Sequence, residues 1–571
     1  MLRTIFAFAT LSLTACATTP TATPSSQPPS AVVTGAVSSA EPRATAAGEA
    51  MLAQGGSATD AAIAVMLALT VVEPQSSGIG GGGFMLHSAA NGPVTSYDGR
   101  ETAPMAADEN WFLGEDGETL GFREVVPGGK SVGVPGNIAL AAMVHERHGR
   151  LDWAALFEPA IRLAREGWPM TERLRSTLEG SPTAPLTAAA RDLYYDGEAP
   201  KPVGTRLTNP RLAATLERLA ELGPEAFYAG RNAEDLRDAV AMAPVAPADM
   251  TLADIEAYRA KERLPVCGTY RHHEICSMGP PSSGATTVLQ ILGLLERFDI
   301  GSMGPDDPDF WHLFAEATRL AFADRGAYLG DHDFVPVPVP GLFDKAYLAE
   351  RSQSISLTSA MDEARAGYPP GNVATAFGQE PRESGTSHFA IADDAGNVVS
   401  YTSTIESAFG SGLMVGGYFL NNELTDFSFD PVGPGGVLAA NRVQPGKRPR
   451  SSMSPAIVFG PDGEALLGVG AAGGATIIAQ TAKTIIAVID FEMDARQAIA
   501  LRNVYAPGGT VLVEEGEGAD ALAAALTARG HGNVRVTSPR FKANAVHKIG
   551  GRWIAAFDPR TEKDVRGVAL P

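Results

Sequence analysis

The sequence has little positive charge to offer a partner. Its 571 residues include 45 lysines and arginines against 65 aspartates and glutamates, which gives a formal net charge of −20 at pH 7. A protein that binds nucleic acid needs a basic surface to neutralise phosphates, so this balance argues against a nucleic-acid partner. The remaining composition, 44% hydrophobic and 19% charged residues, is that of a globular protein with ample material for a core.

Three local patterns resemble known functional motifs, but each of them lacks a feature that its motif requires. The apolar segment 59–72 is too short to span a membrane and predicts a buried helix. The glycine-rich run 78–83 matches the dinucleotide-binding pattern, but residues 84–87 predict a strand where that motif requires a helix. His145 and His148 do not have the spacing of the two histidines in a zinc-protease helix. These patterns therefore favour neither a membrane span, nor a nucleotide cofactor, nor a zinc site.

Cysteine is scarce, with three residues in the whole chain. Cys267 and Cys276 flank a short stretch that predicts a tight hairpin, and they could form a disulfide in an exported protein if they lie opposite each other. The adjacent His272 and His273 raise the alternative of a metal site. The spacing of these four side chains suits a four-ligand site poorly, so we predict no metal.

The third cysteine belongs to a predicted targeting segment, residues 1–16. Arg3 supplies the positive charge of a signal peptide, and residues 5–13 supply its apolar stretch. The sequence Leu-Thr-Ala-Cys ending at Cys16 resembles a bacterial lipobox, in which the cysteine carries the lipid; an ordinary signal peptide cleaved at a nearby alanine is the alternative. Residues 17–38, rich in Thr, Pro and Ser, predict a disordered tether. We therefore expect an exported, periplasmic protein with a lipid anchor to a bacterial membrane.

One threonine lies where a polar loop meets a predicted strand. Residues 364–384 are rich in Gly, Pro, Arg and Glu, and residues 387–392 and 398–404 predict a β-hairpin. Cleavage of the Gly385–Thr386 bond would give Thr386 a free α-amine with a pKa near ~8, which could act as general base for its own hydroxyl. On these local features alone, an ordinary strand start is the alternative.

A longer pattern decides between these interpretations. Five motifs follow one another in order: Thr386-Ser387-His388, Thr402-Ser403-Thr404, residues 409–412, residues 421–427 and residues 445–455. Together they resemble the γ-glutamyltransferase (glutathione hydrolase) family, and the resemblance extends from about Ala44 to near the C-terminus. It implies an enzyme made as one precursor and cut before a threonine nucleophile, and it implies that Thr404 hydrogen-bonds the hydroxyl of that nucleophile.

Arg100 belongs to a second motif, Arg-Glu-x-Ala-Pro, at residues 100–104. A guanidinium can hold a carboxylate through two parallel hydrogen bonds, although from the residues alone a surface ion pair with Glu101 is the alternative. In the family this arginine binds the α-carboxylate of the substrate. Ser451 and Ser452 match the family serines whose hydroxyls complete the hydrogen bonds of that carboxylate.

The resemblance also assigns the opposite end of the substrate and the reacting carbonyl. Glu423 and Asp426 match the positions that bind the α-amine, and acidic side chains suit an ammonium group. Gly473 and Gly474 precede a predicted helix at residues 475–489. Backbone N–H groups at a helix start favour negative charge and could form an oxyanion hole; a simple strand-to-helix turn is the alternative.

Two positions depart from the family pattern. Glu406 stands where well-known members carry an asparagine that contacts the substrate amine; it still accepts from an ammonium, but selectivity could differ. The segment 427–450 matches the lid loop but is somewhat short and lacks the tyrosine that covers the site in typical bacterial members. A looser lid admits water, which favours hydrolysis over transfer.

The resemblance therefore implies an α+β fold, a four-layer αββα sandwich of the N-terminal nucleophile hydrolase type, with residues 39–385 as the large chain and 386–571 as the small chain. We expect a γ-glutamyl donor such as glutathione, an acyl-enzyme on Thr386, release by water or by an amino-acid or dipeptide acceptor, and no cofactor. The alternative enzyme is a glutaryl-β-lactam acylase, whose substrate has no α-amine. A non-catalytic, lipid-anchored binding protein is the alternative of another class, and Thr386, Thr404 and the glycine pair argue against it.

Overall fold

The computed structural model describes Met1 and residues 35–561, apart from 91, 182, 184–186, 374–384, 434–435 and 539–541. The predicted signal peptide beyond Met1, the lipobox Cys16 and the second half of the loop at 364–384 lie outside the described residues. Within the described part of the chain, no helix is both long enough and apolar enough to cross a membrane.

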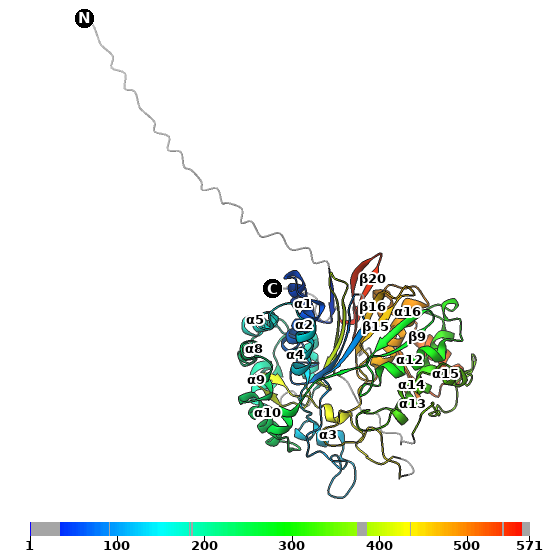
Figure 1. The fold of residues 1–571 in the computed structure, drawn as a ribbon, viewed down its shortest axis with the longest axis horizontal. Coiled ribbons are helices and arrows are strands. Elements are labelled where there is room, and N and C mark those ends of the chain that lie inside the picture. Colours follow the sequence, from blue (N-terminus) through cyan, green and yellow to red (C-terminus); the bar gives the residue numbers. More distant parts are fainter. Residues whose placement is uncertain are drawn as a thin grey trace. The chain divides into compact units, whose positions relative to one another are not determined.

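Two six-stranded antiparallel sheets lie face to face in the middle of the fold (Figure 1). In order across the first sheet, the strands are β1 (Ala36–Ser39), β11 (Ser387–Ala392), β12 (Val398–Thr404), β2 (Gly82–Ser88), β3 (Val94–Asp98) and β8 (Lys261–Arg263). In order across the second, they are β21 (Arg552–Phe557), β20 (Lys542–Ile549), β16 (Ala465–Ala472), β15 (Ala456–Phe459), β10 (His273–Ser277) and β9 (Val266–Tyr270).

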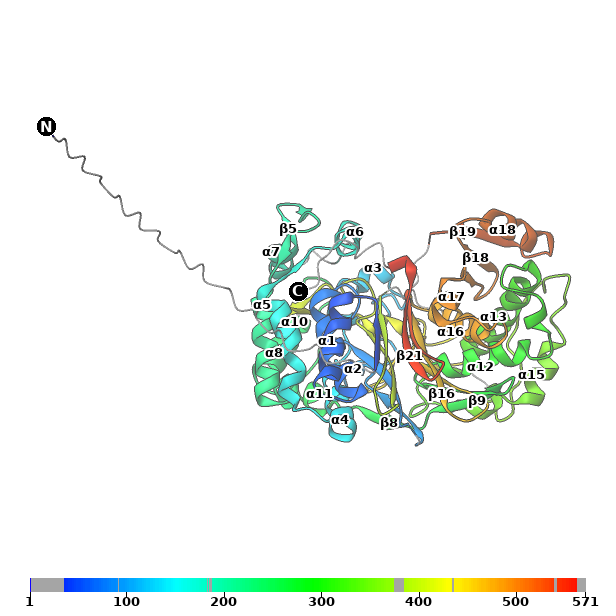
Figure 2. The same ribbon diagram turned by 90° about the horizontal axis from the view of Figure 1, so that it is seen from above.

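Helices cover the outer face of each sheet, so the predicted αββα sandwich is confirmed (Figure 2). On the side of the first sheet lie α1 (Pro42–Ala53), α2 (Ala58–Val72), α4 (Asn137–His148), α5 (Glu158–Glu166), α8 (Pro210–Leu222), α9 (Glu225–Tyr228) and α10 (Arg231–Ala241). On the side of the second lie α12 (Gly284–Leu295), α13 (Pro308–Tyr328), α15 (Lys345–Ser352), α16 (Thr476–Ile489) and α17 (Ala495–Ala500).

Smaller elements surround these layers. The three-stranded sheet of β17 (Val504–Tyr505), β18 (Thr510–Glu514) and β19 (Asn533–Thr537) carries α18 (Ala519–Ala528). The remaining short helices are α3 (Phe122–Val125), α6 (Glu172–Gly180), α7 (Ala188–Tyr194), α11 (Leu252–Ala257) and α14 (Val339–Leu342). The short strands are β4 (Trp168–Pro169), β5 (Tyr195–Asp196), β6 (Ala199–Pro200), β7 (Arg206–Leu207), β13 (Met414–Val415) and β14 (Tyr418–Phe419).

The buried helix predicted at residues 59–72 is confirmed as α2, all of whose residues are buried. Ser57 caps it: its hydroxyl accepts from the Asp60 backbone N–H, and the Asp60 carboxylate accepts from the Ser57 backbone N–H. This reciprocal pair satisfies two of the N–H groups that a helix start leaves without partners. The glycine-rich run before residue 84 leads into strand β2, as predicted.

The hairpin β11–β12 has the bounds that the sequence predicts. Its side chains alternate between two cores, because successive residues of a strand point to opposite faces. Phe389 and Ile391 pack in the core under α2, whereas Ala390 and Ala392 pack in the core between the sheets. Both faces are buried, so a one-residue slip of this strand would place large side chains in the narrow space between the sheets.

The predicted tether boundary at residue 38 is wrong. Residues 36–39 form strand β1, which is buried and pairs with β11 from Ala36 opposite Ala392 to Ser39 opposite Phe389. A run of Ala, Val and Ser carries little strand signal by itself, and only the pairing partner far along the chain makes it a strand. As a result, the hairpin β11–β12 lies between β1 and β2, which both precede residue 386.

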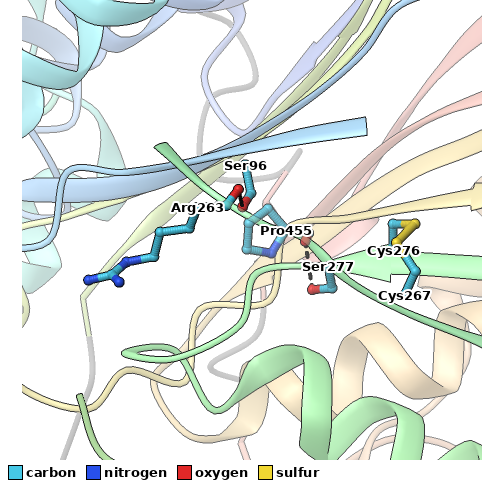
Figure 3. The surroundings of a disulfide bond; sticks show 6 residues. All are labelled: Ser96, Arg263, Cys267, Cys276, Ser277 and Pro455. Atoms are coloured by element: carbon cyan, nitrogen blue, oxygen red, sulfur yellow. Dashed lines mark hydrogen bonds between the residues drawn. A yellow bond between two sulfur atoms is a disulfide. The ribbon is translucent and has the colours of Figure 1, made fainter. Parts of the chain in front are cut away.

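The predicted hairpin at residues 267–276 is confirmed, and its two cysteines are bonded (Figure 3). Cys267 on β9 lies directly opposite Cys276 on β10. At the end of β10, the Ser277 hydroxyl donates to the Pro455 carbonyl at 2.7 Å, just before β15 begins. On the first sheet, the Ser96 hydroxyl of β3 donates to the Arg263 carbonyl of β8 at 2.8 Å.

Gly470 on β16 allows the two sheets to approach closely where the hairpin begins. A Cβ at this position would lie 2.5 Å from two ring atoms of His388, which is buried and hydrogen-bonded to Thr402 at 2.9 Å. We predict that Gly470→Ala lowers the free energy of unfolding by about 1–3 kcal/mol, since the ring has no room to move. Urea denaturation measures this effect. Gly508→Ala is the control, because a Cβ there meets nothing within 4 Å; equal stability of both variants would contradict the packing argument.

Candidate active site

A small cavity of about 10 Å³ brings together side chains from five separate stretches of chain. Its lining residues are Arg100, Thr386, Thr404, Glu406, Glu423, Asp426, Ser451 and Met453. Seven of the eight are predicted site residues, and Met453 is the addition. Two larger hollows, of about 690 and 320 Å³, are lined by none of the predicted residues among those the structure describes. We therefore identify the candidate site by the residues that line it rather than by the volume of the cavity.

Thr386 lies at the entry of β11 with its hydroxyl directed at Thr404. Its Oγ1 donates to Thr404 Oγ1 at 3.2 Å, and Thr404 Oγ1 also accepts from the Glu406 backbone N–H at 2.8 Å. The Thr386 backbone nitrogen donates to the Ser76 carbonyl at 3.0 Å, from the loop that follows α2. The atom that would become an α-amine is therefore held by a residue of the predicted large chain.

The backbone at the Gly385–Thr386 bond is strained and crowded. Thr386 has a φ of 114°, a conformation that costs a β-branched residue energy because its Cβ meets the backbone. At Gly385, a Cβ would lie 1.9 Å from the Glu406 carbonyl oxygen, so only glycine fits. The group that lies close to this glycine is the Glu406 backbone.

A buried ion pair supports the strand one residue beyond Thr386. Ser387 Oγ donates to Glu73 at 2.6 Å, and Lys542 Nζ donates to the same carboxylate at 2.8 Å. Arg173 lies 3.6 Å from the other oxygen of Glu73. Burial would raise the pKa of Glu73, but Lys542 and Arg173 outweigh it and lower that pKa to about 2. This carboxylate therefore stays charged and anchors β11 against β20.

Arg100 makes ion pairs with both Glu423 and Asp426. All three side chains are at least 98% buried, and Arg100 also donates to the carbonyls of Pro449 at 3.2 Å and Arg450 at 3.0 Å. The predicted roles of these groups are separate: Arg100 is expected to bind the substrate α-carboxylate, and the two acids its α-amine. In this structure they neutralise one another instead. Burial raises the pKa of Asp426, and the Arg100 guanidinium acts against that rise.

The two serines occupy different places. Ser451 lines the cavity, and its backbone nitrogen donates to the Pro281 carbonyl at 3.0 Å. Ser452 is fully buried and is not among the described lining residues. Its hydroxyl accepts from the Nη2 of Arg325 on α13 at 2.7 Å. Nothing in the apolar pattern of α13 marks this one arginine as part of a site.

Glu406 takes part in the cavity from an unusual backbone conformation, with a φ of 73°. The amide of Asn422 donates to its Oε2 at 3.1 Å and so fixes the direction of the carboxylate. Asn422 is not among the predicted site residues, because its position in the sequence does not distinguish it from an ordinary turn asparagine. The cavity therefore contains three carboxylates and one guanidinium.

Gly473 and Gly474 form the turn from β16 into α16, with φ values of 122° and 63° that favour glycine. Neither is among the described residues that line the cavity. Their strand nevertheless runs toward Thr386: a Cβ at Gly468 would meet Ala390, and one at Gly470 would meet His388. Each step toward the end of β16 therefore faces a step back toward the start of β11. Continued by two more residues, this correspondence reaches Thr386, and the glycine pair follows directly after that point on β16.

The lid segment 427–450 holds its aromatic side chains away from the cavity. Phe429 stacks on Phe112 with ring centroids 4.2 Å apart, and Phe427 packs in the same apolar cluster. No aromatic side chain is among the described residues that line the cavity. The arrangement fits the absence of a covering tyrosine in the sequence.

Comparison with known proteins identifies the family. The sequence model described as Gamma-glutamyltranspeptidase matches residues 44–568. The chain belongs to this family. It is 38% identical over 481 residues to the glutathione hydrolase proenzyme of Bacillus subtilis (strain 168), a match that covers 82% of this chain and 80% of that protein. It is therefore related to enzymes that are made as precursors.

The family also contains relatives with a different name. The chain is 36% identical over 538 residues to the Acylase ACY 1 proenzyme of Pseudomonas sp. (strain SE83), covering 92% of this chain and 90% of that protein. Its fold is similar to the crystal structure of cephalosporin acylase from Bacillus halodurans, with a TM-score of 0.80, 26% identity, and coverage of 95% of this chain and 97% of that one. Sequence and fold similarity alone do not separate the two activities, so the choice depends on the site.

The Glu73–Lys542 pair yields a prediction about stability. We expect Lys542→Met to lower the free energy of unfolding by on the order of 3 kcal/mol at pH 7, because it leaves a buried carboxylate without its main partner. The folded-state pKa of Glu73 is lowered, so the stabilisation is complete above the ordinary carboxyl pKa and is lost as pH falls toward 2. The difference between variant and parent should accordingly shrink in acid.

Denaturation at several pH values tests this prediction. Glu73→Gln combined with Lys542→Met should recover part of the loss, since no buried charge then remains unpaired. Lys548→Met is the matched control, because Lys548 pairs with Glu464 at the surface at 2.7 Å and should contribute little. A Lys542→Met protein as stable as the Lys548→Met protein would show that the buried pair does not anchor β11.

Proposed function

We propose that this protein is a self-processing hydrolase and transferase of γ-glutamyl amides such as glutathione, with Thr386 as nucleophile. The observation that carries the proposal is the buried group of Arg100, Glu423 and Asp426 beside the Thr386 hydroxyl. A zwitterionic α-amino-acid end offers one carboxylate to Arg100 and one ammonium to the two acids. It can therefore replace the internal ion pairs without leaving a buried charge unpaired.

A glutaryl group would fit this arrangement less well. Its terminal carboxylate could bind Arg100 and displace Glu423 and Asp426 from it. Because a glutaryl group has no ammonium, these two acids would then have no new partner. Leaving buried charges uncompensated is strongly unfavourable. Glu406, held by Asn422, adds a third carboxylate to the same cavity. This excess of negative charge supports a donor with a free α-amine over the acylase alternative.

We propose a reaction in which these groups take the following roles. Thr386 Oγ1 attacks the γ-carbonyl carbon, and its proton passes to the Thr386 α-amine. The tetrahedral oxyanion accepts hydrogen bonds from the backbone around Gly473 and Gly474. The C–N bond then breaks, the leaving amine takes the proton, and a γ-glutamyl ester remains on Thr386. Water, or an amino-acid or dipeptide amine, attacks this ester with the α-amine again as base and restores the hydroxyl.

The α-amine must first be released from the chain. In the precursor, Thr386 Oγ1 attacks the Gly385 carbonyl, the peptide becomes an ester, and water opens it. The strained φ of Thr386 and the close contact at Gly385 favour a reaction that relieves them. The products would stay together, because the hairpin β11–β12 of the small chain pairs with strands of the large chain on both sides.

We also propose that the enzyme works outside the cytoplasm, bound to a bacterial membrane through a lipid on Cys16. The signal-like residues 1–16 and the lipobox support this location, and the disulfide between Cys267 and Cys276 suits an oxidising compartment. Metabolic labelling with a fatty acid, followed by Cys16→Ala, tests the anchor.

The substrate assignment predicts a preference between two chromogenic donors. The matured enzyme should release p-nitroaniline from γ-glutamyl-p-nitroanilide at least ~100-fold more efficiently than from glutaryl-p-nitroanilide, since the second leaves two acids unpaired. Comparison of kcat/KM for the two donors measures this. Faster cleavage of the glutaryl donor would assign the protein to the acylase activity instead.

The open lid predicts that hydrolysis dominates. Adding glycylglycine at high concentration should raise the rate of p-nitroaniline release less than twofold, because water reaches the ester without an aromatic cover. Chromatography of glutamate and of γ-glutamyl-glycylglycine separates the two products. A large rate gain, with the tripeptide as main product, would refute the interpretation of the lid.

The maturation mechanism predicts three variants with different outcomes. Thr386→Ala should remain one chain and be inactive, whereas Thr386→Ser should still be cut because it keeps the hydroxyl. Thr404→Ala should slow both cleavage and turnover by on the order of 10²-fold, since it removes the hydrogen-bond partner of the nucleophile. Gel analysis and N-terminal sequencing of the small chain decide the matter. A small chain that starts elsewhere, or an active Thr386→Ala protein, would refute the mechanism.

A further inference from the structure

A second arginine, Arg325 on α13, lies fully buried behind the serines of the site. Its Nη2 donates to Ser452 Oγ at 2.7 Å, and its Nε donates to Ser283 Oγ at 2.8 Å. Ser283 in turn holds the Ser451 carbonyl twice, through its hydroxyl at 2.7 Å and its backbone nitrogen at 2.8 Å. One guanidinium therefore supports both serines of the predicted carboxylate site.

The contact with Arg325 restricts the directions open to the Ser452 hydroxyl. Arginine has only donors, so the Ser452 oxygen must accept in this hydrogen bond. A hydroxyl has one hydrogen, and the hydrogen of Ser452 is consequently directed to another acceptor. A substrate carboxylate is such an acceptor. If the arginine were absent, the hydroxyl could rotate and present its lone pairs, which would repel a carboxylate.

Arg325 also contributes to the charge balance of the site. Burial raises the pKa of Asp426, and Arg325 joins Arg100 in opposing that rise. It connects two parts of the chain as well, because Arg325 and Ser283 precede residue 386 whereas Ser451 and Ser452 follow it. After maturation, the large chain would hold the serines of the small chain in place.

We propose that Arg325 is a positioning residue, which orients Ser452 directly and Ser451 through Ser283 so that both present hydrogen-bond donors to the α-carboxylate of the donor substrate. The proposal rests on the proposed function, in which that carboxylate binds at Arg100 and the serines. It predicts that Arg325 acts on substrate affinity through these two serines, rather than on the chemical step or on folding alone.

A double-mutant cycle tests this coupling. We would measure KM and kcat for γ-glutamyl-p-nitroanilide in the matured parent, Arg325→Gln, Ser452→Ala and the double variant. Each single change should raise KM roughly ten- to hundredfold with a much smaller change in kcat, because each removes a hydrogen bond to a charged group. Because Ser452→Ala already removes the Arg325–Ser452 contact, adding Arg325→Gln to it should raise KM by clearly less than it does in the parent. The part that remains is the effect through Ser283 and Ser451. A double variant whose KM rises by the product of the single effects would overturn the proposal.

A matched control separates positioning from general destabilisation. Arg297 donates through its Nε to Ser352 Oγ at 2.8 Å, the same contact at a distance from the site. Arg297→Gln should leave KM unchanged even if the protein becomes less stable. If Arg325→Gln fails to mature, Ser283→Ala tests the route through Ser451, because it removes the Nε partner of Arg325 and retains the charge. An unchanged KM in matured Ser283→Ala would then count against the proposal.

Failure of the proposed function would look different from failure of this inference. If the parent cleaves only glutaryl-p-nitroanilide, the γ-glutamyl assignment fails, but the same cycle with the glutaryl donor still tests Arg325, since that donor also ends in a carboxylate. If the parent cleaves neither donor, calorimetric titration of the matured proteins with L-glutamate and with glutarate supplies the four affinities. Affinities that are independent of Arg325 would refute its role.

Discussion

The candidate site depends on one buried charge balance, in which Arg100 faces Glu423 and Asp426 away from water. Buried ions are tolerated only with partners, so these groups hold two distant stretches of chain together until a ligand supplies equivalent charges. A ligand that carries one carboxylate and one ammonium meets this condition, and one that carries a single charge does not. Under the proposed function, the constraint that stabilises these buried charges also favours such a ligand.

The fold brings the reacting hydroxyl to this charged group through the position of one hairpin. The strands β11 and β12 lie between β1 and β2, so residues from both sides of the predicted cleavage point form one continuous sheet. Glu73 accepts hydrogen bonds from Ser387 at the start of β11 and from Lys542 on β20, and so connects the two strands. The close contact of Gly470 with His388 sets the separation of the sheets. Cleavage at residue 386 would change the covalent connection and leave the hydrogen-bonded framework in place.

Much of this arrangement could be predicted from the sequence, and the failures have physical reasons. The alternation of Phe389 and Ile391 with small residues predicts β11, and the apolar segment after Asp60 predicts α2, because periodicity is a local property. Strand β1 escaped prediction because its only signal is its pairing with β11. Other features depend on how side chains from distant segments point toward one another, and no local pattern contains that information. These are the ion pairs of Arg100 with two acids and the contacts of Arg325 and Asn422. The lipid anchor stays a prediction.

The central claim is that Thr386 carries the γ-glutamyl group during turnover. Intact-protein mass spectrometry of the small chain, after rapid acid quenching during cleavage of γ-glutamyl-p-nitroanilide, tests it most directly. The account predicts a small chain heavier by one glutamyl group, with the added mass located on its N-terminal threonine by fragmentation and absent from Thr386→Ala. An adduct on another residue, or steady turnover without any adduct when ester hydrolysis is the slow step, would contradict the account.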